Sequence, residues 1–177
     1  MDFDLKGFQA ECNEWQNYNF PHTPASDVLH GVSEEFGELC HALHIGRMGG
    51  MIDAIGDIGI FATNFANKMG IDIAKVVIDH GDAYFEGQPR PYYPYPSLFI
   101  LGVEIGRLHH AFLKARQGIR GASERQIEIA FANFWVQLTS SAMVMCQKPL
   151  ETILQDTWDI VKKRNWRDHP EHGGGSA

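Results

Sequence analysis

The residues best suited to chemistry are acidic and stand at helical spacing in the first third of the chain. Glu34, Glu38 and His41 occupy positions i, i+4 and i+7, and Glu35 lies about 100° further round the same predicted helix. Three carboxylates therefore share one side of that helix. Because like charges repel at this spacing, the cluster costs free energy unless positive charge lies among its members.

A second polar stripe follows after a short glycine-rich turn. Asp53, Asp57 and Asn64 fall within about 40° of one another on a helical wheel. A short turn predicts antiparallel neighbouring helices, so the two acidic stripes can face each other. Hard oxygen ligands without a cysteine set favour Mg²⁺, with Mn²⁺ as a second choice, over zinc. The alternative is an ordinary solvated helix face.

The elements that position these residues are predicted to be helices. Apolar residues repeat every three or four positions along most of the chain, and alternating strand-like stretches are rare. The sequence therefore predicts an all-α helical bundle. The expected helices cover roughly residues 3–17, 26–45, 52–69, 72–84, 97–117, 123–146 and 150–165.

A proline-rich stretch divides the chain. Residues 88–96 contain four prolines and predict an extended connector. Residues 34–43 and 103–112, at an offset of 69, share five identities in ten positions. We therefore expect a diverged duplication in which two MazG-like units pack as a pseudo-dimer, although chance similarity between helices is an alternative. The expected parts are residues 1–87 with the acidic site, 97–170 as a degenerate unit, and 171–177 as a disordered tail.

The composition excludes several classes of function. A net charge of −7 argues against a broad nucleic-acid surface, so no nucleic-acid polymer is expected as a partner. The three cysteines form no CxxC pair, which favours a reducing cytoplasm over a disulfide framework. Apolar runs such as 98–103 are far shorter than the roughly 20 residues of a membrane helix, and no membrane is expected. Without a glycine-rich phosphate loop, a nucleotide would be bound through metal.

The acidic residues resemble those of a known family. Glu34-Glu-Phe-Gly-Glu38 followed by Asp53-Ala-Ile-Gly-Asp57 is similar to the paired acidic motif of the MazG-like, all-α nucleotide pyrophosphohydrolases. Residues 15–20, 113–121 and 157–166 also resemble segments of that family. The resemblance implies Mg²⁺-dependent cleavage of a nucleoside triphosphate between its α- and β-phosphates, which releases a monophosphate and pyrophosphate.

Carried over residue by residue, the resemblance implies specific roles. Glu35, Glu38 and Asp57 would ligate the metal, and Glu35 or Glu38 would accept a proton from the attacking water. The family's fourth acid would stand where this sequence has Ala54. Asp53 is expected to replace it, and the neighbouring Glu34 is counted with the metal set.

Other residues are expected to contact the nucleotide. Trp15 and Phe20 are candidates for stacking on the base, and Asn19 for a hydrogen bond to its edge; core packing is the alternative for the aromatic rings. Cations of the second half are expected at the phosphates, although a solvated helix end is equally consistent with the basic run 162–164. The remaining candidate substrate contacts are His41, Phe61, Asn64, Lys114, Lys162, Lys163 and Arg164.

Two alternatives remain open from sequence. Glu38-Leu-Cys-His41 is half of the ExxH pair of di-iron bundles, but the duplicate position has Arg107 instead of glutamate. The second unit is expected to have lost its metal ligands. An offset of 69 places Val103, Glu104 and Arg107 at the positions of Glu34, Glu35 and Glu38, and an offset of 77 places Ala130 and Phe134 at those of Asp53 and Asp57. The runner-up function is therefore an inactive MazG-like module that binds nucleotide or a partner protein. A homodimer also remains open.

Overall fold

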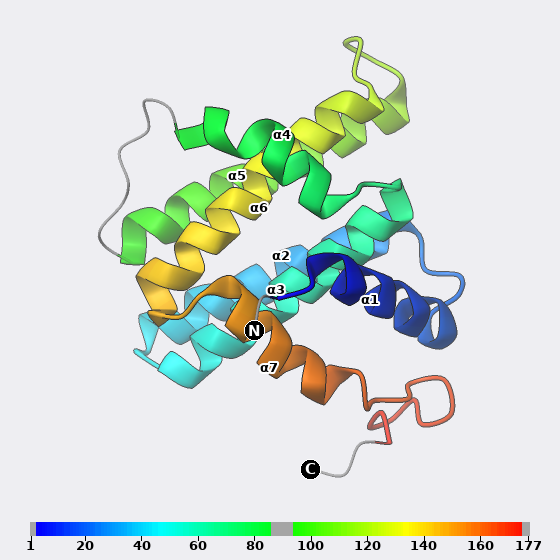
Figure 1. Cartoon of the computed structure of the whole chain (residues 1–177), viewed down its shortest axis with the longest axis vertical. Helices are drawn as coiled ribbons and strands as arrows, with labels where there is room; N and C mark the ends of the chain where they lie inside the picture. Colours follow the sequence, from blue (N-terminus) through cyan, green and yellow to red (C-terminus); the bar gives the residue numbers. More distant parts are fainter. Residues whose placement is uncertain (1–2, 86–93, 175–177) are drawn as a thin grey trace.

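The computed structural model describes residues 3–85 and 94–174, with side chains described outside 80–85. The described residues form helices and turns without a strand, which confirms the all-α prediction (Figure 1). The helices are α1 Leu5–Asn19, α2 Ala25–His44, α3 Met48–Met69, α4 Ile73–Phe85, α5 Pro94–Gln117, α6 Glu124–Ser141 and α7 Leu150–Val161, with a π-helical turn, η1 Ala142–Cys146, directly after α6.

Two long helical hairpins form the body of the fold. α2 packs along α3, and α5 packs along α6. The helix that follows each hairpin crosses to the other hairpin: α4 packs mainly on α6, and α7 packs mainly on α3 (Figure 1). One continuous apolar core results, and its largest fully buried side chains include Ile55, Ile58, Phe65, Phe131, Phe134 and Leu138.

Small residues bring α7 close to α3. A Cβ atom on Gly56 would overlap the side chain of Thr157, and a Cβ atom on Gly59 would overlap that of Leu154. The overlap at Gly56 reaches the Cβ atom of Thr157, so in a close-packed core it could be relieved only by a shift between α3 and α7, whereas the overlap at Gly59 involves the end of the flexible Leu154 side chain. This close approach holds the chain after α7 near the acidic side of α3.

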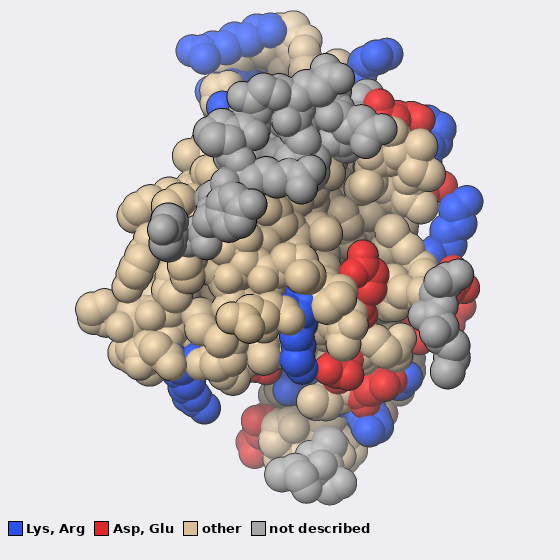
Figure 2. All heavy atoms as spheres, turned by 60° about the vertical axis from the view of Figure 1, so that its left-hand side comes forward, with Lys and Arg blue, Asp and Glu red and all other residues tan. Residues whose placement is uncertain are grey.

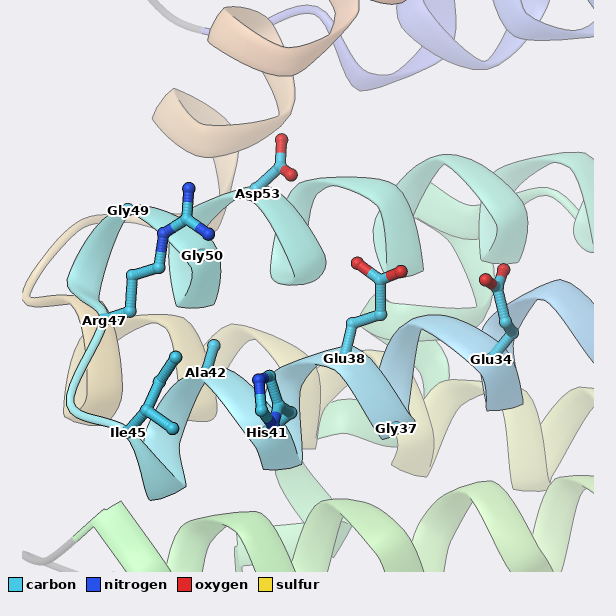
Figure 3. A pocket seen from close by; sticks show the side chains of 10 residues that line it. All are labelled: Glu34, Gly37, Glu38, His41, Ala42, Ile45, Arg47, Gly49, Gly50 and Asp53. Carbon is cyan, nitrogen blue, oxygen red and sulfur yellow. The ribbon is translucent and has the colours of Figure 1, made fainter.

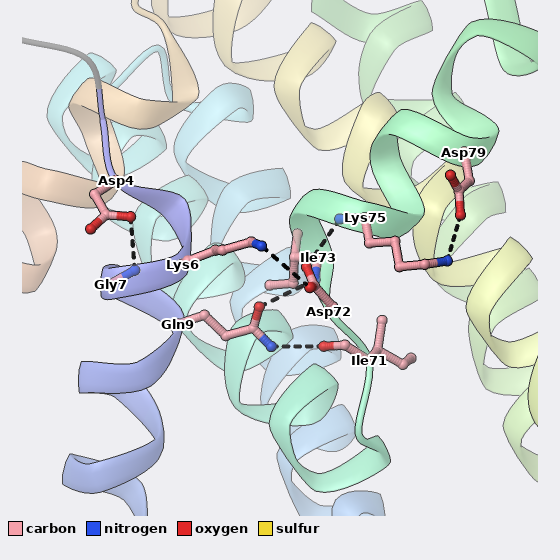
Figure 4. Close-up of polar contacts among 9 residues, drawn as sticks. All are labelled: Asp4, Lys6, Gly7, Gln9, Ile71, Asp72, Ile73, Lys75 and Asp79. Atoms are coloured by element: carbon pink, nitrogen blue, oxygen red, sulfur yellow. Dashed lines mark hydrogen bonds and ion pairs between the residues drawn. The ribbon is translucent and has the colours of Figure 1, made fainter.

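α1 is fixed to the turn between α3 and α4. The Gln9 side chain donates from Nε2 to the carbonyl of Ile71 at 2.7 Å and accepts at Oε1 from the amide of Ile73 at 3.2 Å (Figure 4). Lys6 and Asp72 form an exposed ion pair at 3.9 Å. These contacts fix the start of α1, so that its far end, with Trp15, reaches the C-terminal segment.

Several predicted boundaries are wrong. Residues 94–96 belong to α5 instead of an extended connector, because prolines are tolerated in the first turn of a helix. Residues 86–93 of the predicted connector lie outside the described residues. α7 ends at Val161, four residues earlier than expected.

The predicted disordered tail is wrong for its first part. The amide of Asn165 donates to the carbonyl of Gly173, and Gly173 is buried. Residues 171–174 therefore belong to an ordered series of turns that follows α7. Residues 175–177 lie outside the described residues.

One stretch has the length and hydropathy of a membrane span. It covers Glu124–Cys146, which is α6 with η1. In the fold, 61% of its apolar window is buried against other helices. Packing in the core therefore accounts for its apolar composition.

Candidate metal and nucleotide site

The acidic edges of α2 and α3 lie next to each other, as the spacing predicted. Glu34 and Glu38 project from α2 toward α3, and Asp53 lies on α3 beside Arg47, the residue that precedes the helix (Figure 3). These side chains surround a cavity of about 780 Å³. Its lining residues are Glu34, Gly37, Glu38, His41, Ala42, Ile45, Arg47, Gly49, Gly50 and Asp53.

Glu35 and Asp57 line a neighbouring, smaller pocket of about 360 Å³. Residues from α1, α2, α3 and the segment after α7 form its walls, and several of them are aromatic. The lining residues are Trp15, Gln16, Phe20, Thr23, Asp27, Val28, Glu35, Asp57, Ile60, Phe61, Asn64, Val161, Arg164 and Trp166. We call this cavity the aromatic pocket, and the one around Glu38 the acidic pocket.

The carboxylates of the two pockets form one electrostatic cluster. The pKa of Glu35 is raised to about 8, first by burial and then by the charges of Asp57, Glu34, Glu38 and Asp53 in that order of importance. Burial and nearby carboxylates, first Asp53, together raise the pKa of Asp57 to about 6. Positive charge in this cluster would therefore be strongly favoured.

A cation from the C-terminal segment already acts on this cluster, in addition to Arg47 in the acidic pocket. The Arg164 guanidinium opposes the rise in the pKa of Asp57. Arg164 also lines the aromatic pocket, and its backbone carbonyl accepts a hydrogen bond from the Trp15 indole at 3.0 Å. The segment after α7 thus places a cation beside the acidic edge.

The acidic residues lie near one another, but their side chains do not converge on a common point where one metal ion could bind. Among the described residues, no three His, Cys, Asp or Glu side chains are arranged to hold one ion. Ala54, where the resemblance to the MazG-like proteins would place a fourth acid, is buried in the core, whereas Asp53 is exposed and lines the acidic pocket. The expected replacement of residue 54 by Asp53 therefore remains a prediction.

Asn64 gives the aromatic pocket an unsatisfied acceptor. Its side chain is only 1% exposed, and its Oδ1 has no hydrogen-bond partner. Asn64 stands seven residues, about two turns, after Asp57 on α3, so both line the same pocket. Buried polar atoms are nearly always paired, which makes this oxygen a candidate contact for a bound donor group.

The predicted aromatic contacts come together, but Asn19 has another role. Trp15, Phe20 and Phe61 all line the aromatic pocket, and the rings of Trp15 and Phe20 meet edge to face at 5.8 Å. Asn19 is buried; its Oδ1 accepts from the amide of Trp166 at 2.7 Å, and its Nδ2 donates to the carbonyl of Trp15. Its amide therefore fastens the C-terminal segment to α1 and does not line the pocket.

The predicted cations separate in space. Lys162 pairs with Asp159 on α7, and Lys163 is exposed; neither lines the aromatic pocket. Lys114 lines a different cavity, on the α5–α6 hairpin. Of the four cations expected at the phosphates, only Arg164 lies at the acidic cluster.

The aromatic pocket also contains residues that the sequence did not suggest as contacts. Trp166 is the most prominent of them, and Gln16, Thr23, Asp27 and Ile60 are others. Trp166 follows Arg164 closely, and the signals for this segment were the basic run and the resemblance of residues 157–166 to a family segment. Because the last helix was expected to continue to residue 165, the turn after Val161 that brings Trp166 to the pocket was not predicted.

The candidate site consists of two adjoining parts, the acidic edge of α2 and α3 and the aromatic pocket. An acidic edge suited to a divalent cation adjoins an aromatic pocket with an unpaired amide oxygen. Comparison of the chain with protein-family models, with curated proteins and with solved structures finds no match. The ligand is therefore inferred from the residues of the site.

Proposed function

We propose that this chain is a Mg²⁺-dependent nucleoside triphosphate pyrophosphohydrolase with one site, at the edge between α2 and α3. The observation that carries the proposal is the shared pocket, in which Glu35 and Asp57 meet aromatic rings and the unpaired Asn64 oxygen. Such a cavity suits a ligand with an aromatic ring at one end and anionic, metal-bound groups at the other. The same acids carry the resemblance to the MazG-like pyrophosphohydrolases.

The acidic residues fit a hard divalent cation. Glu34, Glu35, Glu38, Asp53 and Asp57 offer only carboxylate oxygens, the donors that Mg²⁺ and Mn²⁺ prefer. Because these side chains do not yet converge, ligation requires them to rotate toward a common centre. When bound, Mg²⁺ would neutralise charge on the phosphates and lower the pKa of an attacking water.

The protein's own groups then orient the nucleotide and accept the proton. The base enters between Trp15, Phe20 and Phe61, where stacking on aromatic faces binds any base. Asn64 Oδ1 accepts a hydrogen bond from an N–H or O–H group of the nucleoside, which rejects ligands without a donor there. Glu35 or Glu38 accepts the proton of the water that attacks the triphosphate.

We also propose that the chain is a diverged duplication that packs as a pseudo-dimer. The crossing of α4 onto α6 and of α7 onto α3 supports it, because each hairpin is covered by the helix that follows the other one. The sequence similarity between residues 34–43 and 103–112 agrees with this pairing. In this view only the first unit keeps a metal-binding acidic set.

The second candidate function is an inactive module that binds nucleotide. The buried Ala54 at the fourth acidic position and the absence of a finished metal set among the described residues favour it. The aromatic pocket would still bind a nucleoside in such a module. Catalysis therefore distinguishes the two candidates.

Phosphorus-31 NMR of purified protein with canonical and modified nucleoside triphosphates tests the proposal. In the presence of Mg²⁺ or Mn²⁺ we expect monophosphate and pyrophosphate to appear together, and EDTA to stop the reaction. Nucleotide binding without turnover in the whole panel would favour the inactive module. Diphosphate with inorganic phosphate as the products would contradict cleavage between the α- and β-phosphates.

A further inference from the structure

The α5–α6 hairpin carries a cavity of about 570 Å³ that is lined by cations. Basic side chains also stand out at the end of the molecule that carries the α5–α6 turn (Figures 1 and 2). No acidic residue occurs among the lining residues that the structure describes. They are Val103, Gly106, Arg107, His110, Ala111, Lys114, Arg120, Ala122 and Gln126. We call this cavity the basic pocket.

The basic pocket occupies the position of the acidic pocket in the other hairpin. Each of the six α5 residues that line the basic pocket stands 69 positions after a residue that lines the acidic pocket. Each of the other three, in the α5–α6 turn and α6, stands 73 positions after such a residue. The pairs are Glu34 with Val103, Gly37 with Gly106, Glu38 with Arg107, His41 with His110, Ala42 with Ala111, Ile45 with Lys114, Arg47 with Arg120, Gly49 with Ala122, and Asp53 with Gln126.

This register refines the alignment made from sequence. An offset of 77 for α6 is four residues, about one helical turn, longer than the offset that the pockets give. With 73, Asp57 corresponds to Ala130 and Asn64 to the buried Gln137. The hollow is thus retained in the second hairpin, and its acids are replaced.

The replacements reverse the charge of the hollow. Arg107 stands in place of Glu38, Lys114 in place of Ile45, and Gln126 in place of Asp53. Arg107 is held in position by the buried Glu104, whose Oε1 accepts from its Nη1 at 2.7 Å. This pairing offsets one positive charge and leaves those of Lys114 and Arg120.

Lys114 and Arg120 offer their charge to a ligand. Among the described residues, neither has an acidic partner within ion-pair distance, and Lys114 donates only to the neutral Gln117 at 3.0 Å. Arg120 stands at φ 59°, in the left-handed region that a side chain with Cβ rarely adopts. A pocket with this excess of cations, on a chain of net charge −7, attracts a compact anion.

We propose that the basic pocket binds an oligophosphate anion, through Arg107, Lys114 and Arg120. Guanidinium and ammonium groups are the donors that phosphate oxygens prefer, and three of them around one hollow match the spread charge of a di- or triphosphate. Among its described lining residues, His110 has the only aromatic ring, and no Phe, Tyr or Trp is present to stack on a base, which favours recognition of the phosphates. This inference does not depend on the proposed function.

Calorimetric titration in EDTA tests the basic pocket separately from the metal site. Inorganic pyrophosphate, tripolyphosphate and ATP serve as probes, and without divalent cations the acidic pocket cannot bind them through metal. The variant Lys114→Gln/Arg120→Asn removes two cations, and asparagine tolerates the left-handed backbone at residue 120. Arg125→Gln is the matched control, because Arg125 is exposed in the first turn of α6 and does not line the pocket.

We expect the double variant to bind tripolyphosphate about tenfold or more weakly and Arg125→Gln to bind within about twofold of the wild type. ATP and tripolyphosphate should bind with similar affinity, which would support recognition of the phosphates alone. Unchanged binding by the folded double variant, or no binding by the wild type, would overturn the proposal. ATP binding about tenfold tighter than tripolyphosphate would do so too, because the described lining of the basic pocket has no Phe, Tyr or Trp to hold a base.

Discussion

The two hairpins present hollows at matching positions but with opposite charge. On α2–α3 the hollow is lined by Glu34, Glu38 and Asp53 together with Arg47, whereas on α5–α6 it is lined by Arg107, Lys114 and Arg120, of which Arg120 corresponds to Arg47. The helical frame is alike in both, since six positions on one helix face correspond without a gap. A few side chains therefore decide whether such a hairpin attracts a cation or an anion.

The hairpins also differ in what is added around them. The segment after α7 crosses to the first hairpin, where Arg164 and Trp166 form part of the aromatic pocket. Its hydrogen bonds to Trp15 and Asn19 hold it against α1. The aromatic pocket thus depends on contacts between the two ends of the chain as well as on the acidic helices.

The largest expected effect comes from removing a single acid of the first hairpin. Asp57→Asn should lower kcat by about 100-fold or more, because it removes a metal ligand from the reacting centre. The fold should be retained, since the change also relieves repulsion from Asp53. Pyrophosphate release and circular dichroism measure the two effects. The exposed Glu14→Gln on α1 is the control, and wild-type turnover in Asp57→Asn would contradict the metal assignment.

A smaller effect is expected from the aromatic wall. Phe61→Leu should raise KM by about tenfold with little change in kcat, because stacking on a base contributes to binding before and during the reaction. Steady-state kinetics separate the two constants. Phe99→Leu, on an exposed part of α5, should leave both unchanged. Equal KM values in the Phe61 and Phe99 variants would remove the ring from the nucleoside contact.

Adjacent cations give a sharper comparison. Arg164→Gln should raise KM by about fivefold, because its guanidinium lies at the acidic cluster and can contact the phosphates. Lys163→Gln should have no effect, since Lys163 is exposed and outside the pocket. The same steady-state assay measures both. A larger effect at residue 163 than at residue 164 would contradict the observed separation of the basic run.

The smallest expected effect is on stability and depends on pH. Burial and neighbouring acids raise the pKa of Glu35 from 4.5 to about 8, so the folded chain holds this proton more tightly than the unfolded chain. The resulting stabilisation is complete below pH 4.5 and is lost as the pH rises through 8. Metal-free protein should therefore have a lower Tm at pH 8 than at pH 5.

Glu35→Gln isolates this contribution. Glutamine resembles the protonated acid, so the variant should lose less of its Tm over the same pH range. A remaining slope is expected from Asp57, whose pKa is raised to about 6. Thermal denaturation in EDTA at several pH values measures the difference. Identical pH profiles for wild type and variant would show that Glu35 is not the titrating group.

The sequence predicted the local part of this site well. Helical spacing predicted that the acidic edges of α2 and α3 can face each other, because both helices of the hairpin are strongly periodic and joined by a three-residue turn. The grouping of Glu35 with Asp57 came from the resemblance to the MazG-like family. Asn64 was found in the same way, as it extends the polar stripe of α3. Helical periodicity determines which residues of one helix share a face, and it was therefore enough to predict the acidic edges of α2 and α3.

The parts of the site that the sequence did not predict depend on contacts between residues far apart in the chain. Trp15 and Arg164 are 149 residues apart, and no local pattern indicates their hydrogen bond. Lys114 was predicted to lie at the acidic site, but it lies on α5 and lines the basic pocket of the other hairpin. Asn19 looked available for a base because its partner, the amide of Trp166, lies 147 residues away.

Binding of Mn²⁺, followed by electron paramagnetic resonance of the free ion, tests most directly whether the facing acidic edges of α2 and α3 form a cation site. The wild type should remove Mn²⁺ from solution, and Mg²⁺ should compete with it. Glu35→Gln/Asp57→Asn should lose this binding, whereas Lys114→Gln/Arg120→Asn should retain it. Equal Mn²⁺ binding by the acidic-site variant and the wild type, or none by the wild type, would contradict a metal site at this edge.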